Sequence, residues 1–242
     1  MHQLWFTELL NRLFAGPVTA LLHAIGVHPH DPHAPITNAV AMQILVALIL
    51  VLFFVAVRLK LSVEKPGGIQ HLMEGINGFV GGMGEEMIGH HHTRFDAYLI
   101  TLGIFILSCN LIGLIPGFES PTAIPSIPLG CAIVTWFYYH YQGLRDKGIK
   151  YFAHFFGPVW WMGWLMFPIE VVSHLARLMS LTIRLFANMF AGDMVTLAFF
   201  SLVPVGIPVF FLGLHLGVSF IQTYIFILLA AVYLAEATAH EH

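Results

Sequence analysis

The chain has 242 residues, of which 58% are hydrophobic and only 10% are charged, and its formal net charge is −3. An average soluble domain is about a quarter charged, so this composition excludes a soluble fold, which needs a polar surface. The few basic residues also exclude the clustered basic face of a nucleic-acid-binding protein. Several apolar runs approach the roughly 20 residues that cross a bilayer, which predicts an all-α polytopic membrane protein.

The N-terminal segment, residues 4–25, alternates apolar and polar side chains at helical spacing. It lacks the basic start of a cleavable signal peptide, and Glu8 and Arg12 interrupt its apolar part. We predict an amphipathic helix that lies in the membrane interface and breaks near Gly16 and Pro17. A loop rich in proline and histidine follows.

The middle of the chain contains three apolar spans and one more polar segment. Residues 39–57 form the first span. Residues 69–88 are rich in glycine and carry three glutamates, so we predict a helix that lies on the membrane surface rather than crossing it. The second and third spans are predicted over residues 97–115 and 129–141.

Two longer apolar segments, residues 168–202 and 208–237, end the chain. Each is longer than a perpendicular crossing requires, and long hydrophobic helices tilt to fit the bilayer. We therefore predict a tilted helical hairpin, which brings the total to five transmembrane helices.

The positions of Lys and Arg predict the orientation, because cytoplasmic loops are enriched in these residues. They are absent from residues 13–57, 116–128 and 203–209, and they gather in residues 58–94 and 145–150. This alternation places the N-terminus outside and the C-terminus in the cytoplasm.

Two arginines lie within the fourth span, where an Arg costs roughly 2.5–3.5 kcal/mol on insertion scales. Such a residue usually faces a partner or a water-filled cavity. At 100° per residue, one stripe of this helix carries both arginines and several other polar side chains, namely Glu170, Ser173, Arg177, Arg184 and Asn188. The stripe is typical of the wall of a wet pathway, or of a face that opposes a polar partner.

The last span carries a similar stripe. His215, Ser219 and Gln222 fall within about 60° of one another, and Glu236 lies near that face. The two stripes can therefore face each other or a shared cavity. Asp193 points away from Arg184 on a regular helix, so either Gly192 allows a local break or Asp193 serves a different compartment.

Structural roles compete with functional ones for these residues. Intramembrane Ser and Asn can simply join helices, and Glu170 with Arg177 can form a structural lock. Arg184 differs because no acidic residue lies three or four positions away, so its counter-charge must come from another helix or another chain.

The cysteines and histidines give weaker signals. Cys109 and Cys131 lie in apolar runs and are predicted to be buried side chains rather than a disulfide. Short histidine tracts at residues 28–33 and 90–92 can bind metal, but neither has the spacing of a zinc site. We expect no metal site and no cofactor.

The C-terminal half resembles subunit a of the membrane sector of F-type ATP synthases. The resemblance rests on SLTIRLFANMFAGD, on the preceding PIEVVSHLAR and on the following HLGVSFIQTYIFILLAAVYLAEA, and it extends to NLIGLIPGFESPT in the middle of the chain. It implies a non-catalytic stator in which two aqueous half-channels couple proton flow to rotation of a c-subunit ring. It also implies a single domain over residues 1–242 that has an outside-facing part (1–38), peripheral helices (39–150) and a proton-channel hairpin facing the ring (151–242).

The resemblance assigns roles to individual residues. The essential arginine of the family corresponds to Arg184, and its polar neighbour corresponds to Asn188. The acidic position after the arginine corresponds to Asp193, where Glu is common, and the acidic position before it to Glu170. The histidine and glutamine of the last helix correspond to His215 and Gln222. We add Ser173, beside Glu170, as a residue that lines the cytoplasmic exit.

The implied partners are the c ring, the subunit b stalk, the remaining ATP synthase subunits and the lipid bilayer, and the implied location is the bacterial inner membrane. The alternative is a self-contained ion or solute transporter, which typically contains inverted repeats. We find no such repeat, and no second helix with a central carboxylate that could carry the ion.

Overall fold

The structure is a computed structural model that describes residues 4–24, 26, 34–59, 61–62, 67–115, 118–148, 151, 163–202 and 206–238. Every regular element in these ranges is helical, which confirms the all-α class. The elements are α1 (Trp5–Ala24), α2 (Asn38–Leu59), α3 (Gly68–Ile88), α4 (Thr93–Ile112), the short 3₁₀ helix η1 (Pro121–Ala123), α5 (Ser126–Lys147), α7 (Gly163–Leu202) and α8 (Ile207–Thr238).

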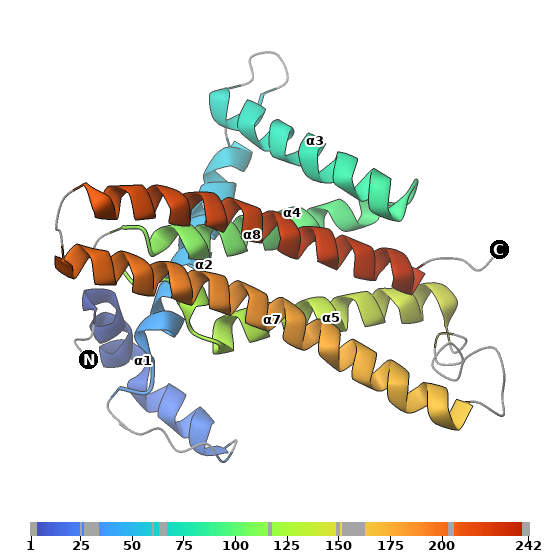
Figure 1. The fold of residues 1–242 in the computed structure, drawn as a ribbon, viewed down its shortest axis with the longest axis horizontal. Coiled ribbons are helices and arrows are strands. Elements are labelled where there is room, and N and C mark those ends of the chain that lie inside the picture. The colour runs from blue at the N-terminus through green and yellow to red at the C-terminus, as the bar shows by residue number, and fades with distance from the viewer. Residues whose placement is uncertain are drawn as a thin grey trace.

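The predicted C-terminal hairpin is present, and its helices are the longest in the structure. α7 has 40 residues and α8 has 32, and they lie side by side along the molecule (Figure 1). At 1.5 Å per residue they are about 60 and 48 Å long, whereas a bilayer core is about 30 Å thick. A hydrophobic helix of this length fits a bilayer by tilting, by kinking or by thickening the bilayer locally, so the tilt stays a prediction. Part of the turn between them, residues 203–205, lies outside the described residues.

Among the described residues, four helices are long and apolar enough to cross a membrane: α2, α4, α7 and α8. α5 contains the predicted third span, and whether it crosses the bilayer stays a prediction. α3 confirms the helix expected over residues 69–88, and it projects from the rest of the molecule (Figure 1).

The core lies where α8 packs against α4, α5 and α7. Large apolar side chains from α4, α7 and α8 are fully buried there, among them Phe95, Leu185 and Phe226. Cys109 and Cys131 are buried free thiols, as predicted from their apolar surroundings. This packing holds one face of α8 against α7.

The predicted break in the N-terminal helix is wrong, because α1 continues through Gly16 and Pro17. A proline removes one backbone N–H and can bend a helix, but the hydrogen bonds on either side can keep the helix intact. α1 is also tied to the segment before α2. The Asn11 amide donates to the carbonyl of Ile36 (3.1 Å) and accepts from its N–H (3.0 Å).

A buried polar network fixes α8 relative to α4 and η1. The Asn110 side chain accepts a hydrogen bond from Thr122 Oγ1 (2.7 Å) and donates one to Thr223 Oγ1 (3.3 Å). Thr223 donates in turn to the carbonyl of Ser219, on the face of α8 that carries His215 and Gln222. The network therefore sets the position of the polar stripe of α8.

We expect Asn110→Ala to destabilise the protein by about 1–3 kcal/mol, because it removes two hydrogen bonds within a fully buried site. The measurement is the thermal unfolding midpoint of the detergent-solubilised protein. Asn77→Ala, at an exposed position of α3, is the matched control and should leave the midpoint unchanged. Equal midpoints for both variants would contradict the role given to Asn110.

Candidate functional site

The polar stripes of α7 and α8 meet at two points, where Asn188 bonds Gln222 and where Arg177 bonds Glu236. The Asn188 amide donates a 2.6 Å hydrogen bond to Gln222 Oε1 across the hairpin. Ser219 is fully buried and lies against Met189, with its Oγ 3.9 Å from the sulfur. Three polar side chains of α8, His215, Ser219 and Gln222, are thus buried on the side that meets α7.

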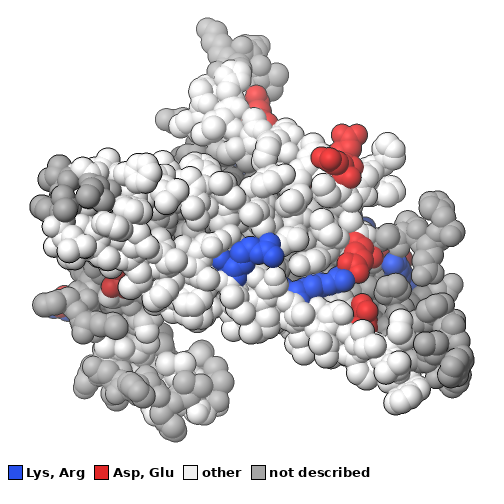
Figure 2. Space-filling model, in the orientation of Figure 1, with Lys and Arg blue, Asp and Glu red and all other residues white. Residues whose placement is uncertain are grey.

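Arg184 lies near the middle of α7 and forms no ion pair within the described part of the chain. Its Nη2 donates one hydrogen bond of 3.3 Å to Ser180, one turn away on the same helix. Figure 2 shows two separate groups of basic atoms over α7 and α8, of which one adjoins acidic atoms and the other is surrounded by uncharged surface. Arg177 pairs with Glu236, whereas Arg184 has no acidic partner among the described residues.

Towards the turn of the hairpin, an acid on α7 meets a histidine on α8. Asp193 Oδ1 lies 3.6 Å from His215 Nδ1. His215 is only 3% exposed, and its Nε2 has no hydrogen-bond partner among the described residues. Asp193 therefore points away from Arg184, as helical spacing predicted, and it reaches the neighbouring helix.

Gly192 lets His215 approach α7 closely, and the helix has no break there. A Cβ at Gly192 would lie 2.8 Å from His215 Nδ1, which is closer than real Cβ contacts. The local break considered from the sequence is therefore wrong, because a small residue on a regular helix suffices to bring the imidazole beside Asp193.

A cavity of about 310 Å³ opens beside this pair, between α7 and α8. Its polar lining comes from Asn188, Thr196 and His215, and the other lining residues are apolar or glycine. The volume is sufficient for several water molecules. Asn188 thus borders the cavity on one side and bonds Gln222 across the hairpin.

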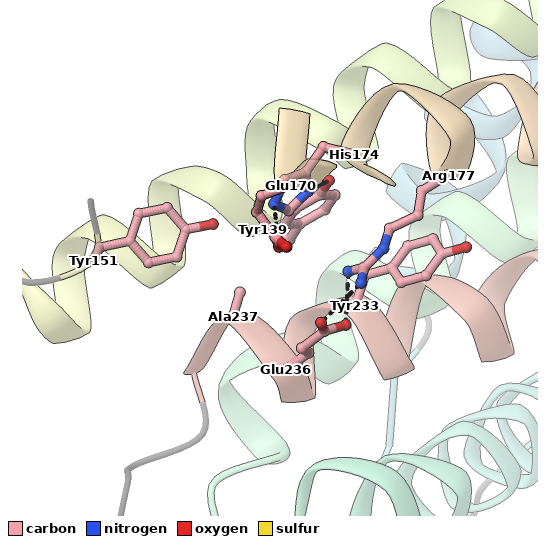
Figure 3. A pocket seen from close by; sticks show the side chains of 8 residues that line it. All are labelled: Tyr139, Tyr151, Glu170, His174, Arg177, Tyr233, Glu236 and Ala237. Atoms are coloured by element: carbon pink, nitrogen blue, oxygen red, sulfur yellow. Dashed lines mark hydrogen bonds and ion pairs between the residues drawn. The ribbon is translucent and has the colours of Figure 1, made fainter. Parts of the chain in front are cut away.

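At the opposite end of the hairpin, a second ionisable cluster surrounds a small cavity of about 10 Å³ (Figure 3). Arg177 donates two hydrogen bonds to the Glu236 carboxylate, at 2.6 and 2.8 Å, and lies over the ring of Tyr233. The structural ion pair between Glu170 and Arg177 that was considered from the sequence is wrong, because Arg177 pairs with Glu236. Glu170 instead lies 3.4 Å from His174 Nε2.

Four residues of this second cluster were not selected from the sequence: Tyr139, Tyr151, His174 and Tyr233. His174 follows Glu170 by one helical turn, so its spacing could have indicated it, whereas the tyrosines come from distant segments. Burial raises the pKa of Tyr151 to about 12, so its hydroxyl is neutral. Ser173 is half-buried and does not line this cavity.

The two clusters lie on opposite sides of Arg184 along α7. Glu170 precedes it by about 21 Å and Asp193 follows it by about 14 Å, at 1.5 Å per residue. Carboxylates and imidazoles can bind and release protons, whereas a guanidinium stays protonated. The arrangement is therefore a permanent cation between two groups that can exchange protons.

Within the described part of the chain, no three His, Cys, Asp or Glu side chains lie close enough together to hold a metal ion. His92 is engaged otherwise, since its Nδ1 lies 2.9 Å from Asp96. The tract at residues 28–33 lies outside the described residues.

Comparison with known proteins extends the resemblance. A family model described as ATP synthase A chain matches residues 39–235. The chain is 66% identical to ATP synthase subunit a of Koribacter versatilis over 242 residues, which cover 100% of this chain and 99% of the relative. It is 48% identical to ATP synthase subunit a of Solibacter usitatus over 235 residues, which cover 97% and 100%. It is 42% identical to ATP synthase subunit a 1 of Syntrophotalea carbinolica over 196 residues, which cover 81% and 84%.

We expect Gly192→Ala to destabilise the hairpin by about 1–3 kcal/mol, because the added methyl group must displace the His215 ring. The measurement is again the thermal unfolding midpoint. Gly213→Ala on α8 is the matched control, since a Cβ there has no neighbour within 4 Å. The control should be neutral or slightly stabilising, because alanine favours a helix over glycine. A Gly192→Ala variant as stable as the control would refute the tight contact.

Proposed function

The chain belongs to the ATP synthase A chain family, and we propose that it is the stator subunit that couples proton flow to ring rotation in an F-type ATP synthase. Family membership supports its place in the membrane part of that complex. The finer role rests chiefly on one observation. Arg184 is a cation on an apolar helix, it has no acidic partner in the described chain, and an ionisable cluster lies on either side of it.

In the proposed mechanism, the acid that Arg184 lacks is supplied by a ring of c subunits. A protonated ring carboxylate that approaches Arg184 becomes ionised, because a cation within about 4–6 Å favours the charged form of an acid. The released proton leaves through one half-channel. After the ring has moved past Arg184, a proton from the other half-channel neutralises the carboxylate. Arg184 itself passes no proton on, so it blocks direct leakage between the two paths.

Asp193 and His215 are proposed to relay protons in the outside half-channel. Two observations support this. His215 presents a buried ring nitrogen without a partner among the described residues, and the ring borders a cavity that has room for water. A histidine suits this task because its unperturbed pKa is near neutral.

Glu170 and Ser173 are proposed to line the cytoplasmic half-channel, at the opposite end of the hairpin. Asn188 lies one turn after Arg184 on α7, and its 2.6 Å hydrogen bond to Gln222 of α8 bridges the helices between the two ends. We propose that they position Arg184 or bound a hydrated space beside it, so that the guanidinium stays partly hydrated. Hydration weakens the contact between Arg184 and the ring carboxylate, so that the ring does not stall.

The proposed driving force is the membrane potential, which supplies about 2.3 kcal/mol per charge per 100 mV. In this role the chain makes and breaks no covalent bond and needs no cofactor. We propose one domain over residues 1–242, in which residues 151–242 face the ring, residues 39–150 lie peripherally and residues 1–38 face outside.

The proposed partners are the c ring, the subunit b stalk and the remaining ATP synthase subunits. The proposed location is the bacterial inner membrane, with the N-terminus outside and the C-terminus in the cytoplasm. The distribution of Lys and Arg between the loops supports this orientation.

Arg184→Lys tests the proposed gate. Lysine is a compact point charge that loses its proton readily in an apolar site, so it cannot replace a permanently charged guanidinium. We expect ATP-driven acidification of inverted membrane vesicles to be abolished, while the amount of the chain in the membrane is unchanged. Arg58→Lys, at the exposed end of α2, is the matched control and should pump normally. Near-normal pumping by Arg184→Lys would refute the proposed function.

The double change Asp193→Asn with His215→Ala tests the outside half-channel. We expect proton flux to fall by about tenfold or more, because positioned proton-transfer groups contribute at least this much. ATP hydrolysis should fall in parallel, since the gate remains and the enzyme stays coupled. Unchanged proton flux in vesicles would remove both residues from the pathway.

A further inference from the structure

We propose that His174, oriented by Tyr139, is a positioning residue that holds the carboxylate of Glu170 at the cavity between α5, α7 and α8. The inference rests on the proposed function, because it treats Glu170 as a group of the proton pathway. Neither His174 nor Tyr139 was selected from the sequence, and neither has a role in the mechanism described above.

The imidazole of His174 lies between a carboxylate and a phenol. Its Nε2 is 3.4 Å from Glu170 Oε1, and its Nδ1 is 3.0 Å from the hydroxyl oxygen of Tyr139 (Figure 3). His174 is 8% exposed and Tyr139 is 2% exposed, so both contacts are largely shielded from solvent. The three side chains form a continuous row from α5 to the cavity.

The chemistry of the two neighbours selects one tautomer of His174. An ionised carboxylate only accepts hydrogen bonds, so the ring nitrogen that faces Glu170 must carry the proton. In a neutral imidazole the other nitrogen is then an acceptor, and the Tyr139 hydroxyl beside it can donate. Tyr139 therefore donates to Nδ1, and the protonated Nε2 lies 3.4 Å from Glu170 Oε1. Tyr139 thereby fixes the ring so that its N–H points at the carboxylate.

Packing around the ring restricts its rotation. The ring of His140 lies 4.7 Å from that of His174, centroid to centroid, and the ring of Tyr139 lies 5.9 Å away. His140 is itself held, because its Nδ1 donates to the carbonyl of Trp136 at 2.9 Å. His174 is thus enclosed by aromatic side chains of α5.

Arg177 is on the same helix and is the stronger donor, but it is engaged elsewhere. Both of its terminal nitrogens bond Glu236, and its guanidinium lies over Tyr233. An arginine that paired with Glu170 would hold the Glu170 carboxylate in its charged form. A neutral imidazole N–H orients the carboxylate with a weaker bias, which suits a group that must both take up and release protons.

The test uses the intact ATP synthase in inverted vesicles and measures ATP-driven acidification per assembled complex. His174→Leu keeps the bulk of the side chain but has no N–H, and we expect it to lower the rate about tenfold, because the close contact between an N–H and the carboxylate is lost. His174→Gln retains an N–H near the position of Nε2 and should stay within about twofold of the unmodified protein. Tyr139→Phe removes one oxygen atom and should give an intermediate loss.

His71→Leu is the matched control, because it makes the same change at an exposed histidine of α3 and should have no effect. If His174→Leu does not assemble, Tyr139→Phe decides the test. Equal losses in His174→Leu and His174→Gln, or full activity in His174→Leu or in Tyr139→Phe, would overturn the positioning role. Arg184→Lys in the same assay distinguishes failure of the proposed function from failure of the positioning role of His174. If it pumps normally, the proposed function fails, whereas if it is inactive and His174→Leu is normal, only the role of His174 fails.

Discussion

Arg184 carries a permanent positive charge in the middle of an apolar helix, and no acidic side chain in the described chain pairs with it. A charge in such a place is costly to insert, so the fold must hold it beside water or beside an acid from another polypeptide. Both solutions require that one side of α7 stays uncovered at this level. The core satisfies this requirement because α8 and α5 pack against a neighbouring side of α7, where Leu185 is fully buried.

The fold separates fixed charges from groups that can exchange protons. The strongest ion pair on the hairpin, Arg177 with Glu236, joins the ends of α7 and α8 by two short hydrogen bonds. Such a pair stays ionised and holds the two helices together. It leaves Glu170 without an arginine, although the two residues share a helix stripe. A carboxylate without a permanent counter-charge is the kind of group that a proton pathway requires.

Helical periodicity was sufficient to predict the hairpin and the polar stripes of its two helices. The polar residues are few in apolar helices of this length, so the face on which they fall can be derived from the sequence. It also placed Asp193 on the far side of α7 from Arg184. It could not assign partners across the fold: Arg177 and Glu236 are 59 positions apart, and Tyr139 belongs to another helix. The break predicted near Gly16 and Pro17 came from the local preferences of these two residues, and α1 in fact continues through them because the surrounding helical hydrogen bonds persist.

The two ends of the hairpin contain the same pair of chemical groups, but different helices supply them. At each end a carboxylate of α7 faces an imidazole, at 3.6 Å for Asp193 with His215 and at 3.4 Å for Glu170 with His174. The first pair bridges two helices, and its outer ring nitrogen has no partner among the described residues. The second lies within one helix, and its outer nitrogen meets a tyrosine. A nitrogen without a partner can bind water and pass protons on, whereas a nitrogen held by a phenol fixes the orientation of its ring. The pattern therefore favours a relay at the Asp193 end and an oriented acceptor at the Glu170 end, with Arg184 between them as the proposed barrier.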